Sequence, residues 1–337
     1  MMSILPPAPA PGSRADAPAL NRRAIARLSQ GDLEGALADF CRCVELSPGH
    51  AEAWNNSGLV RQRLGQFAGA RADFDQALAL RPDYPEALNN RGQARQRAGD
   101  LAGAMTDFDQ ALACVTDQFA ASVLHNRGAL RQRFGDLAGA LADFDRALQI
   151  DPGHLATYVN RGTARKEAGD LAGALADFDF ALERVGPDQS ATVYHHRGGV
   201  KALLNDFAGA LTDYNVALAL EPNNPVFHLS RGNARYHRRD PLALADYRTA
   251  FRLDAEGAAR EAARMLADDA RRDAEGVLEN CRKHLRISAR DAVAHARRGL
   301  TLLLLGRAAE AENDLEQART LQPEYWPLLK RLVALIV

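Results

Sequence analysis

The sequence repeats itself, and the period of this repeat constrains the fold more than any other feature. The stretches 88-LNNRGQARQRAGDLAGAMTDFDQAL-112, 124-LHNRGALRQRFGDLAGALADFDRAL-148 and 158-YVNRGTARKEAGDLAGALADFDFAL-182 are near copies. Six copies align on one glycine, at spacings of 34, 36, 34, 36 and 34 residues: Gly58, Gly92, Gly128, Gly162, Gly198 and Gly232. This period predicts one elongated array of stacked pieces, although 337 residues would otherwise suggest two or three domains.

Each copy predicts two helices joined by a tight turn. In one copy the first helix covers about 87–98, and Gly99 and Asp100 then supply a helix C-terminal cap and the next N-terminal cap. The apolar residues of the second helix share one face, at the spacing i, i+4, i+7, i+8: Ala104, Phe108, Ala111 and Leu112. Such short helices are stable only when neighbouring copies bury their apolar faces.

These positions resemble the tetratricopeptide repeat family. In the copy at 51–84 the family pattern reads Trp54, Gly58, Ala70, Phe74, Ala77 and Pro82. Several copies match in register, so the resemblance covers nearly the whole chain. It implies an all-α, right-handed superhelical solenoid of stacked helix-turn-helix repeats, with a concave groove lined mainly by the first helices.

The resemblance divides the chain into three parts. We expect a disordered Pro/Ala-rich tail at 1–16, nine repeats over 17–325 and a capping helix at 326–337. The repeats cover 17–50, 51–84, 85–120, 121–154, 155–190, 191–224, 225–257, 258–291 and 292–325; the eighth is degenerate, because it lacks the repeat glycine. The apolar segment 326–337 either docks on the last repeat or forms a homodimer contact.

An arginine and an aspartate recur together. The arginine precedes the repeat glycine and the aspartate precedes the aromatic residue of the second helix, as in Arg91 with Asp107, Arg127 with Asp143, Arg161 with Asp177, and Arg197 with Asp213. An arginine can hold a carboxylate with two hydrogen bonds, so we expect one ion pair per layer, within a repeat or between neighbours. An anion-binding role of these arginines is the alternative. Where the family has a large apolar residue, the first helices carry Arg61, Arg95, Arg131 and Arg165, which predicts partly ionic helix packing.

An asparagine stands before the Arg-Gly place in four successive copies, as Asn56, Asn90, Asn126 and Asn160, and His196 continues the row. Asparagine is not favoured inside helices. The column resembles the asparagine ladder in the tetratricopeptide superhelix of O-linked N-acetylglucosamine transferases, which holds the backbone of an extended peptide through amides that both donate and accept. The resemblance implies a peptide-binding groove.

Five further residues are candidates for this groove: Asn55, Asn89, Arg63, Arg97 and Arg133. If the arginines face inward, acidic partner segments are favoured. Three alternatives remain open. The asparagines could be kept only because the repeats were duplicated, or they could hydrogen-bond a neighbouring helix. The arginines could form a solvated face.

Composition and missing motifs exclude several functions. The net charge of −1 shows no basic excess for nucleic acid, and no run of about 18 apolar residues predicts a membrane span. The sequence lacks phosphate-binding, dinucleotide-binding and metal-ligand motifs, so we expect no cofactor, no metal and no enzyme activity. The four cysteines are poorly placed to pair and the N-terminus does not read as a signal peptide, so we expect a cytoplasmic location.

The predicted function is a non-enzymatic adaptor that binds an extended peptide segment of a partner protein. A regulatory sensor that responds to a ligand or peptide is one alternative. A homo-oligomeric structural scaffold that assembles through 326–337 is the other.

Overall fold

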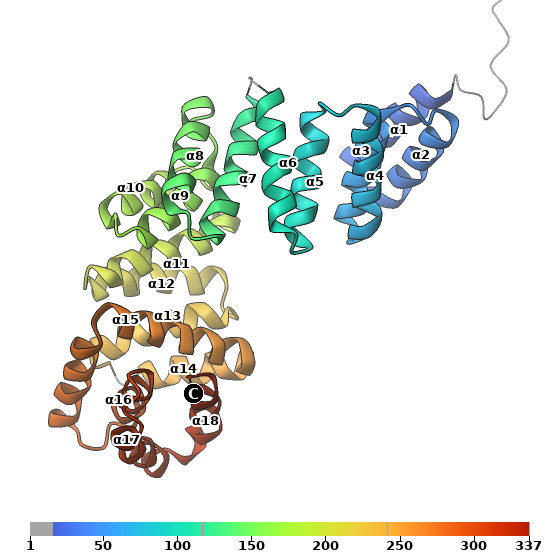
Figure 1. Cartoon of the computed structure of the whole chain (residues 1–337). Coiled ribbons are helices and arrows are strands. Elements are labelled where there is room, and N and C mark those ends of the chain that lie inside the picture. Colours follow the sequence, from blue (N-terminus) through green and yellow to red (C-terminus); the bar gives the residue numbers. More distant parts are fainter. Residues whose placement is uncertain (1–15, 116–117, 241, 337) are drawn as a thin grey trace, which may run out of the picture. The chain divides into compact units, whose positions relative to one another are not determined.

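The computed structural model describes residues 16–115, 118–240 and 242–336, and within these ranges all regular secondary structure is helical. The predicted tail therefore lies outside the described residues except for Asp16, as does Val337 of the capping helix. The chain divides into two compact units, 1–168 and 169–337. In each, helices joined by short turns pack side by side in pairs (Figure 1). The prediction of an all-α repeat solenoid is confirmed.

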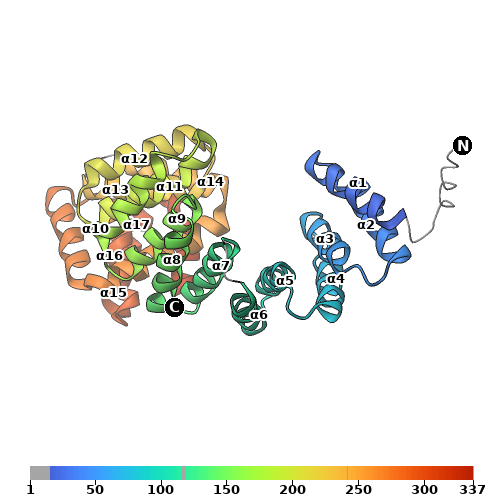
Figure 2. The same ribbon diagram turned by 90° about the horizontal axis from the view of Figure 1, so that it is seen from above.

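Unit 1 holds α1 (Ala17–Ser29), α2 (Leu33–Leu46), α3 (Ala51–Arg63), α4 (Phe67–Leu80), α5 (Pro85–Arg97), α6 (Leu101–Cys114), α7 (Phe119–Arg133), α8 (Leu137–Ile150) and α9 (Leu155–Glu167). Unit 2 holds α10 (Leu171–Leu182), α11 (Pro187–Leu203), α12 (Phe207–Leu220), α13 (Pro225–His237), α14 (Ala243–Leu253), α15 (Ala255–Ile287), α16 (Ala292–Leu304), α17 (Ala308–Leu321), the short η2 (Pro323–Tyr325) and α18 (Trp326–Ile336). Figure 2 shows α3 with α4 and α5 with α6 as successive pairs.

The turn inside a pair depends on one residue in the left-handed region. Gly99 has φ +86°, a conformation that costs glycine little because it has no Cβ. Asp100 then caps the next helix, since its Oδ1 accepts a hydrogen bond from the Gly103 amide at 2.9 Å. In two later repeats a non-glycine residue takes this place, as Asn205 and Arg239 with φ of 62° and 58°.

The core of the first seven repeats is built from one aromatic ring per repeat and many small residues. The rings of Phe40, Phe74, Phe108, Phe144 and Phe178 are fully buried. The first helix comes close to the ring at the repeat glycine: a Cβ on Gly92 would lie 2.7 Å from Cε1 of Phe108. Close helix approach explains why the chain is rich in alanine and has only 6% aromatic residues.

The degenerate repeat departs from the helix-turn-helix form. α15 is 33 residues long and continues through a kink at Asp273, where φ is −159° and ψ is 76°. Arg272 stands where other repeats have the left-handed residue, but it does not adopt a positive φ, so the helix bends at Asp273 without the usual turn. Its two arms point in different directions (Figure 1). Asp273 still caps the second arm, because its Oδ1 accepts from the Gly276 amide at 2.8 Å.

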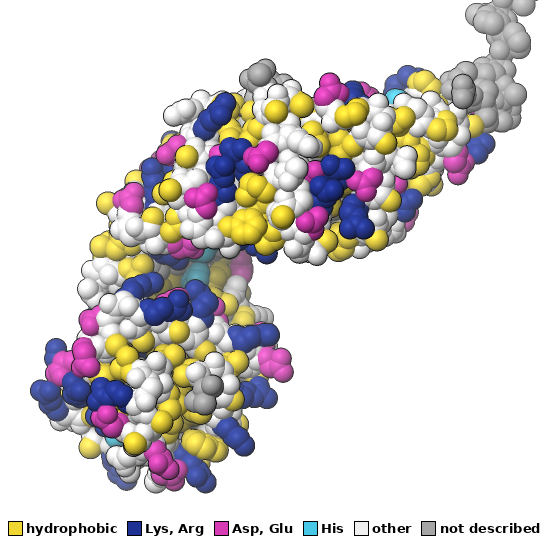
Figure 3. All heavy atoms as spheres, in the orientation of Figure 1, with side chains coloured by type: hydrophobic (Ala, Val, Ile, Leu, Met, Phe, Trp, Pro, Cys, Tyr) yellow, Lys and Arg dark blue, Asp and Glu magenta, His cyan; other side chains and the backbone are white. Residues whose placement is uncertain are grey.

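The C-terminal helix packs on unit 2. Leu329 and Leu332 of α18 are buried in one apolar cluster with Ala259 of α15, Leu300 of α16 and Ala318 of α17. This is the docked arrangement that the sequence left open. The homodimer contact stays a prediction. Over the visible face of the chain, acidic and basic side chains are interspersed (Figure 3), in keeping with the near-zero net charge.

Candidate functional site

Most repeats contain a buried aspartate held by cations of the first helix. Asp143 of α8 is 3% exposed. It accepts hydrogen bonds from Nε and Nη2 of Arg127 at 2.9 and 2.6 Å, and from Nη1 of Arg131 at 2.9 Å. The hydrogen bond with Asp143 is the main reason why the pKa of Arg127 is raised. Two arginines of α7 therefore share one carboxylate.

The same arrangement recurs in other repeats. Arg91 Nη2 and Arg95 Nη1 lie 2.6 and 2.8 Å from Asp107, and Arg197 Nη2 and Lys201 Nζ lie 2.6 and 2.8 Å from Asp213. Arg161 and Asp177 belong to different units, and their pairing stays a prediction.

The arginine before the repeat glycine also reaches the preceding repeat. Arg127 Nη1 donates to Asp109 of α6 at 2.7 Å, while its other nitrogens hold Asp143 of α8. Equivalent bridges are Arg91 to Asp75 at 2.9 Å, Arg161 to Asp145 at 2.6 Å and Arg197 to Asp179 at 2.6 Å. Arg91, Arg127 and Arg197 therefore link two repeats as well as the two helices of their own repeat, which leaves few donors for an anionic ligand.

The second repeat lacks this bridge. Ser57 replaces the arginine and Cys41 replaces the bridging aspartate of the preceding repeat. Asp73 is held by the Ser57 hydroxyl at 2.6 Å and by Arg61 Nε at 2.8 Å. Burial raises the pKa of Asp73, because these partners compensate its lost hydration only in part.

The asparagine column forms hydrogen bonds between neighbouring first helices. Nδ2 of Asn90 donates to Oδ1 of Asn55 at 3.0 Å, and Nδ2 of Asn126 donates to Oδ1 of Asn89 at 2.8 Å. Asn55 and Asn89 are 5% and 4% exposed. Two of the candidate groove residues are therefore buried acceptors in the contact between repeats.

The row continues with other polar groups. Nδ2 of Asn160 lies 3.4 Å from Nε2 of His125, and Nε2 of His195 lies 2.8 Å from Oγ of Ser230. Burial, aided by His154, lowers the pKa of His125 to about 4, so its ring is neutral at physiological pH. His196 stacks on Phe178 with centroids 5.8 Å apart.

These contacts use only part of the hydrogen-bonding capacity of the column asparagines. Asn56, Asn90, Asn126 and Asn160 are all half-buried. In Asn90 and Asn126 one N–H of the amide serves the neighbouring helix. A primary amide has a second N–H and an oxygen with two lone pairs, so further capacity remains.

Three arginines follow the column on the same helix faces. Arg63, Arg97 and Arg133 lie seven residues, or two helical turns, after Asn56, Asn90 and Asn126. All three are exposed. No hydrogen bond or ion pair joins these three side chains to another residue in the described ranges. They form the Arg row: three cations at one place in three consecutive repeats.

The matches to known families coincide with this repeat pattern. Models described as a TPR repeat or a tetratricopeptide repeat match residues 17–50, 63–99 and 159–225. The chain is a tetratricopeptide repeat protein. Repeats of this family mediate contacts between proteins, and they are typical of interaction scaffolds rather than enzymes. No protein among those with curated descriptions matches the sequence.

Solved structures share the fold of this tetratricopeptide repeat protein. One is a tetratricopeptide repeat protein from Parabacteroides merdae, with a TM-score of 0.56 and 17% identity over 71% of this chain and 94% of that one. Another is PilW, a widely conserved type IV pilus biogenesis factor, with a TM-score of 0.56 and 23% identity over 61% of this chain and 94% of that one. A third is the APC/C hetero-tetramer Cut9-Hcn1, with a TM-score of 0.60 and 15% identity over 74% of this chain and 48% of that one. At these identities the likeness shows the fold alone.

Two features are absent from the described part of this tetratricopeptide repeat protein. Within it, no group of three or more His, Cys, Asp and Glu side chains could hold a metal ion. None of its helices combines the length and apolar character needed to cross a membrane. All four cysteines are free thiols.

The bridging aspartates were missed in the sequence, although a signal was present. The second helices read DFD at 73–75, 107–109, 143–145 and 177–179. The first aspartate of each motif is the buried one, and the second is the partner of an arginine in the next repeat. Its recurrence next to the core aromatic could have identified the link between repeats.

Proposed function

We propose that this tetratricopeptide repeat protein is a non-enzymatic adaptor that binds an acidic, extended segment of a partner protein. The binding surface is the face of the first helices α3, α5, α7 and α9 in unit 1. The Arg row (Arg63, Arg97 and Arg133) would hold carboxylates of the segment. The half-buried amides of Asn56, Asn90, Asn126 and Asn160 would pair with its backbone.

The observation that carries the proposal is the unpaired state of the Arg row. Other arginines of the same first helices, such as Arg91 and Arg95, form ion pairs with aspartates of the second helices. The Arg row stands two turns beyond the asparagine column and has no such partner among the described residues. Guanidinium groups favour carboxylates because they can form two parallel hydrogen bonds with them. Since the row repeats once per repeat, its natural ligand is itself extended along the array.

The asparagines play a smaller part in this proposal than the sequence suggested. Part of their hydrogen-bonding capacity goes to Asn55, Asn89 and His125 of the preceding repeats. What remains is suited to a peptide backbone, which alternates donors and acceptors whatever its side chains. The column therefore adds affinity, and the Arg row adds the preference for acidic segments.

A direct test uses two labelled peptides. One alternates glutamate with threonine and valine, which favour extended chains, and the other has glutamine in place of glutamate. Fluorescence anisotropy with the full chain should show tighter binding of the glutamate peptide, and added salt should weaken that binding. The triple variant Arg63→Gln, Arg97→Gln and Arg133→Gln should bind the glutamate peptide about 10- to 100-fold more weakly, if each exposed contact contributes about 0.5–1 kcal/mol.

A matched control separates a specific surface from general attraction. Arg42, Arg71 and Arg146 are exposed on the second helices, and changing them to glutamine removes the same charge. The control variant should keep wild-type affinity. Equal losses in both triple variants, or no binding of the glutamate peptide by the wild type, contradict the proposal. Alanine at the four column asparagines should weaken both peptides by the same factor.

A cytoplasmic location belongs to the same proposal. It is supported by the free thiols of Cys41, Cys43, Cys114 and Cys281, which persist in a reducing compartment.

A further inference from the structure

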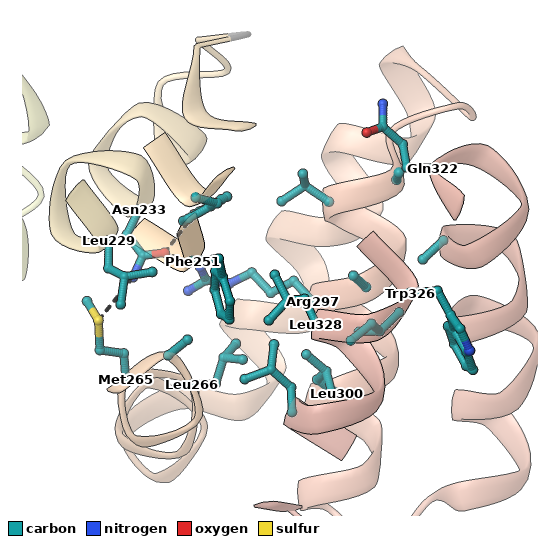
Figure 4. A pocket seen from close by; sticks show the side chains of 18 of the residues that line it. Leu229, Asn233, Phe251, Met265, Leu266, Arg297, Leu300, Gln322, Trp326 and Leu328 are labelled. Carbon is teal, nitrogen blue, oxygen red and sulfur yellow. Dashed lines mark hydrogen bonds between the residues drawn. The ribbon is translucent and has the colours of Figure 1, made fainter. Parts of the chain in front are cut away.

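Unit 2 contains a cavity that the peptide-binding proposal does not use. Its volume is about 120 Å³, and it lies among α13, α14, the first arm of α15, α16 and α18 (Figure 4). Leu229 of α13, Phe251 of α14, Met265 and Leu266 of α15, and Leu300 of α16 form apolar walls. α18 adds Trp326, Leu328, Leu329 and Leu332.

The irregular features of unit 2 create this cavity. In α13 the place of the asparagine column is Ser230. Leu229 lies one residue before Ser230 and Asn233 lies three residues after it, on the same face of the helix. Arg297 occupies the column place itself, directly before Arg298 and Gly299. The side that carries asparagines in earlier repeats here faces the long first arm of α15 and the docked α18. The space that remains between them is lined by side chains from all of these helices.

One end of the cavity is polar. Arg297 is 6% exposed, and its Nη2 lies 2.5 Å from Oδ2 of Asp269. Its Nη1 lies 3.4 Å from Oδ1 of Asn233, which also accepts a hydrogen bond from the Tyr247 hydroxyl at 2.7 Å. Figure 4 shows the Arg297 side chain extending between the apolar walls. A buried cation, its counter-ion, an amide and a phenol are therefore grouped at one end of an apolar space.

The size of the cavity limits its ligand. An apolar cavity of about 150 Å³ stays free of water and binds benzene. The cavity of about 120 Å³ in unit 2 is of similar size, so it suits a molecule with one six-membered ring. Phe251, Met265 and Leu266 are only partly buried, so the apolar wall is reached by solvent and a small molecule can enter.

The charge of the polar end limits the head group. Arg297 and Asp269 neutralise each other, so a charged ligand would bring an uncompensated charge into a largely apolar space. A carboxylate would also meet the Asp269 carboxylate. A hydroxyl both donates and accepts, so it can donate to Asp269 and accept from Arg297 without breaking their pair.

We propose that this cavity binds a small uncharged molecule with an apolar ring and one hydroxyl, of about the size of phenol. The ring lies against the walls formed by Leu229, Phe251, Met265 and Leu300. The hydroxyl lies between Asp269 and Arg297. This site is independent of the Arg row in unit 1, so this unit 2 site and the peptide-binding surface can fail or hold separately.

The first experiment compares three probes on the full chain by ligand-observed NMR. Phenol is the fitted probe, toluene has the same shape without the hydroxyl, and benzoate carries a negative charge. We expect phenol to bind with a Kd on the order of 1 mM, as few heavy atoms allow, and toluene and benzoate to bind several-fold and about ten-fold more weakly. If benzoate binds as tightly as phenol, or if phenol does not bind at about 10 mM, the proposal is wrong.

The second experiment fills the cavity. Ala296 lines it, so Ala296→Leu places three carbon atoms in the space where the ring would lie. The matched control is Ala309→Leu on the exposed start of α17. Phenol binding should be lost in the first variant and unchanged in the second, with both folded by circular dichroism. Retained binding in a folded Ala296→Leu variant contradicts the proposal, and the probe series on the wild type decides the matter if that variant does not fold.

Discussion

The shared carboxylate of Asp143 predicts a large cost for a small change. Asp143→Asn keeps the shape of the side chain and one acceptor oxygen, but it removes the negative charge between Arg127 and Arg131. The three hydrogen bonds to Asp143 then lose their charge assistance on the carboxylate side. Two guanidinium groups remain in a partly buried place with one counter-charge fewer.

The magnitude follows from the burial of the partners. Removing one partner of a fully buried ion pair costs about 3–5 kcal/mol. Here the side chains of Arg127 and Arg131 are 16% and 27% exposed, so both can regain some hydration. Arg127 also keeps Asp109 at 2.7 Å. We therefore expect Asp143→Asn to lower the free energy of unfolding by about 2–3 kcal/mol.

The assay is urea unfolding of the full chain followed by circular dichroism, with hydrogen exchange of the amides in α7 and α8 to locate the effect. The control is Asp109→Asn, which removes the same charge from the same arginine. Because Asp109 is 53% exposed, this change should cost less than about 1 kcal/mol. If Asp143→Asn costs no more than Asp109→Asn, burial does not determine the strength of these pairs and the reasoning fails.

Two further predictions concern packing and pH. Gly92→Ala should cost about 1–3 kcal/mol in urea unfolding, because the new Cβ would lie 2.7 Å from Phe108, whereas Gly49→Ala, with no atom within 4 Å, should be nearly neutral. The hydrogen bond with Arg23 holds the pKa of Asp39 below its usual range, while burial raises the pKa of Asp73. Stability from Asp39 is thus lost as pH falls through its lowered pKa, and stability from Asp73 is lost as pH rises through its raised pKa. Asp39→Asn should therefore lower the Tm more at pH 7 than at about pH 3. Asp73→Asn should lower the Tm less at pH 7 than at about pH 3.

The regular part of the fold could be predicted from the sequence because each local signal recurs. The Gly-Asp turn, the buried phenylalanine and the repeat glycine appear in most repeats, so a doubtful assignment in one copy is settled by its neighbours. The pairing of Arg127 with Asp143 followed from their joint recurrence for the same reason. Local propensity and tertiary packing agree at these places.

The remaining features depend on single positions or on contacts between repeats. α15 passes through Asp273 without a tight turn, since Arg272 is not left-handed at the place where Arg239 of the preceding repeat is. Both residues are arginines, so the residue type at this place does not predict which conformation the backbone adopts. The burial of Asn55 and Asn89 could not be predicted, because adjacent polar residues on a helix give no sign of which one faces the next repeat. The cavity in unit 2 depends on how α15 and α18 pack, which no repeat pattern records.

The bridge from aspartate to arginine to aspartate has a consequence for how such a chain changes over evolutionary time. Arg91, Arg127, Arg161 and Arg197 each meet the preceding repeat through the same kind of aspartate. A gene duplication or deletion of one whole repeat of 34 or 36 residues would therefore join surfaces that already match. The first repeat, with Cys41 at this place, lacks that interchangeable surface. The interior of the array can thus gain or lose whole repeats, whereas the first repeat can be followed only by a repeat that, like the second, does without this bridge.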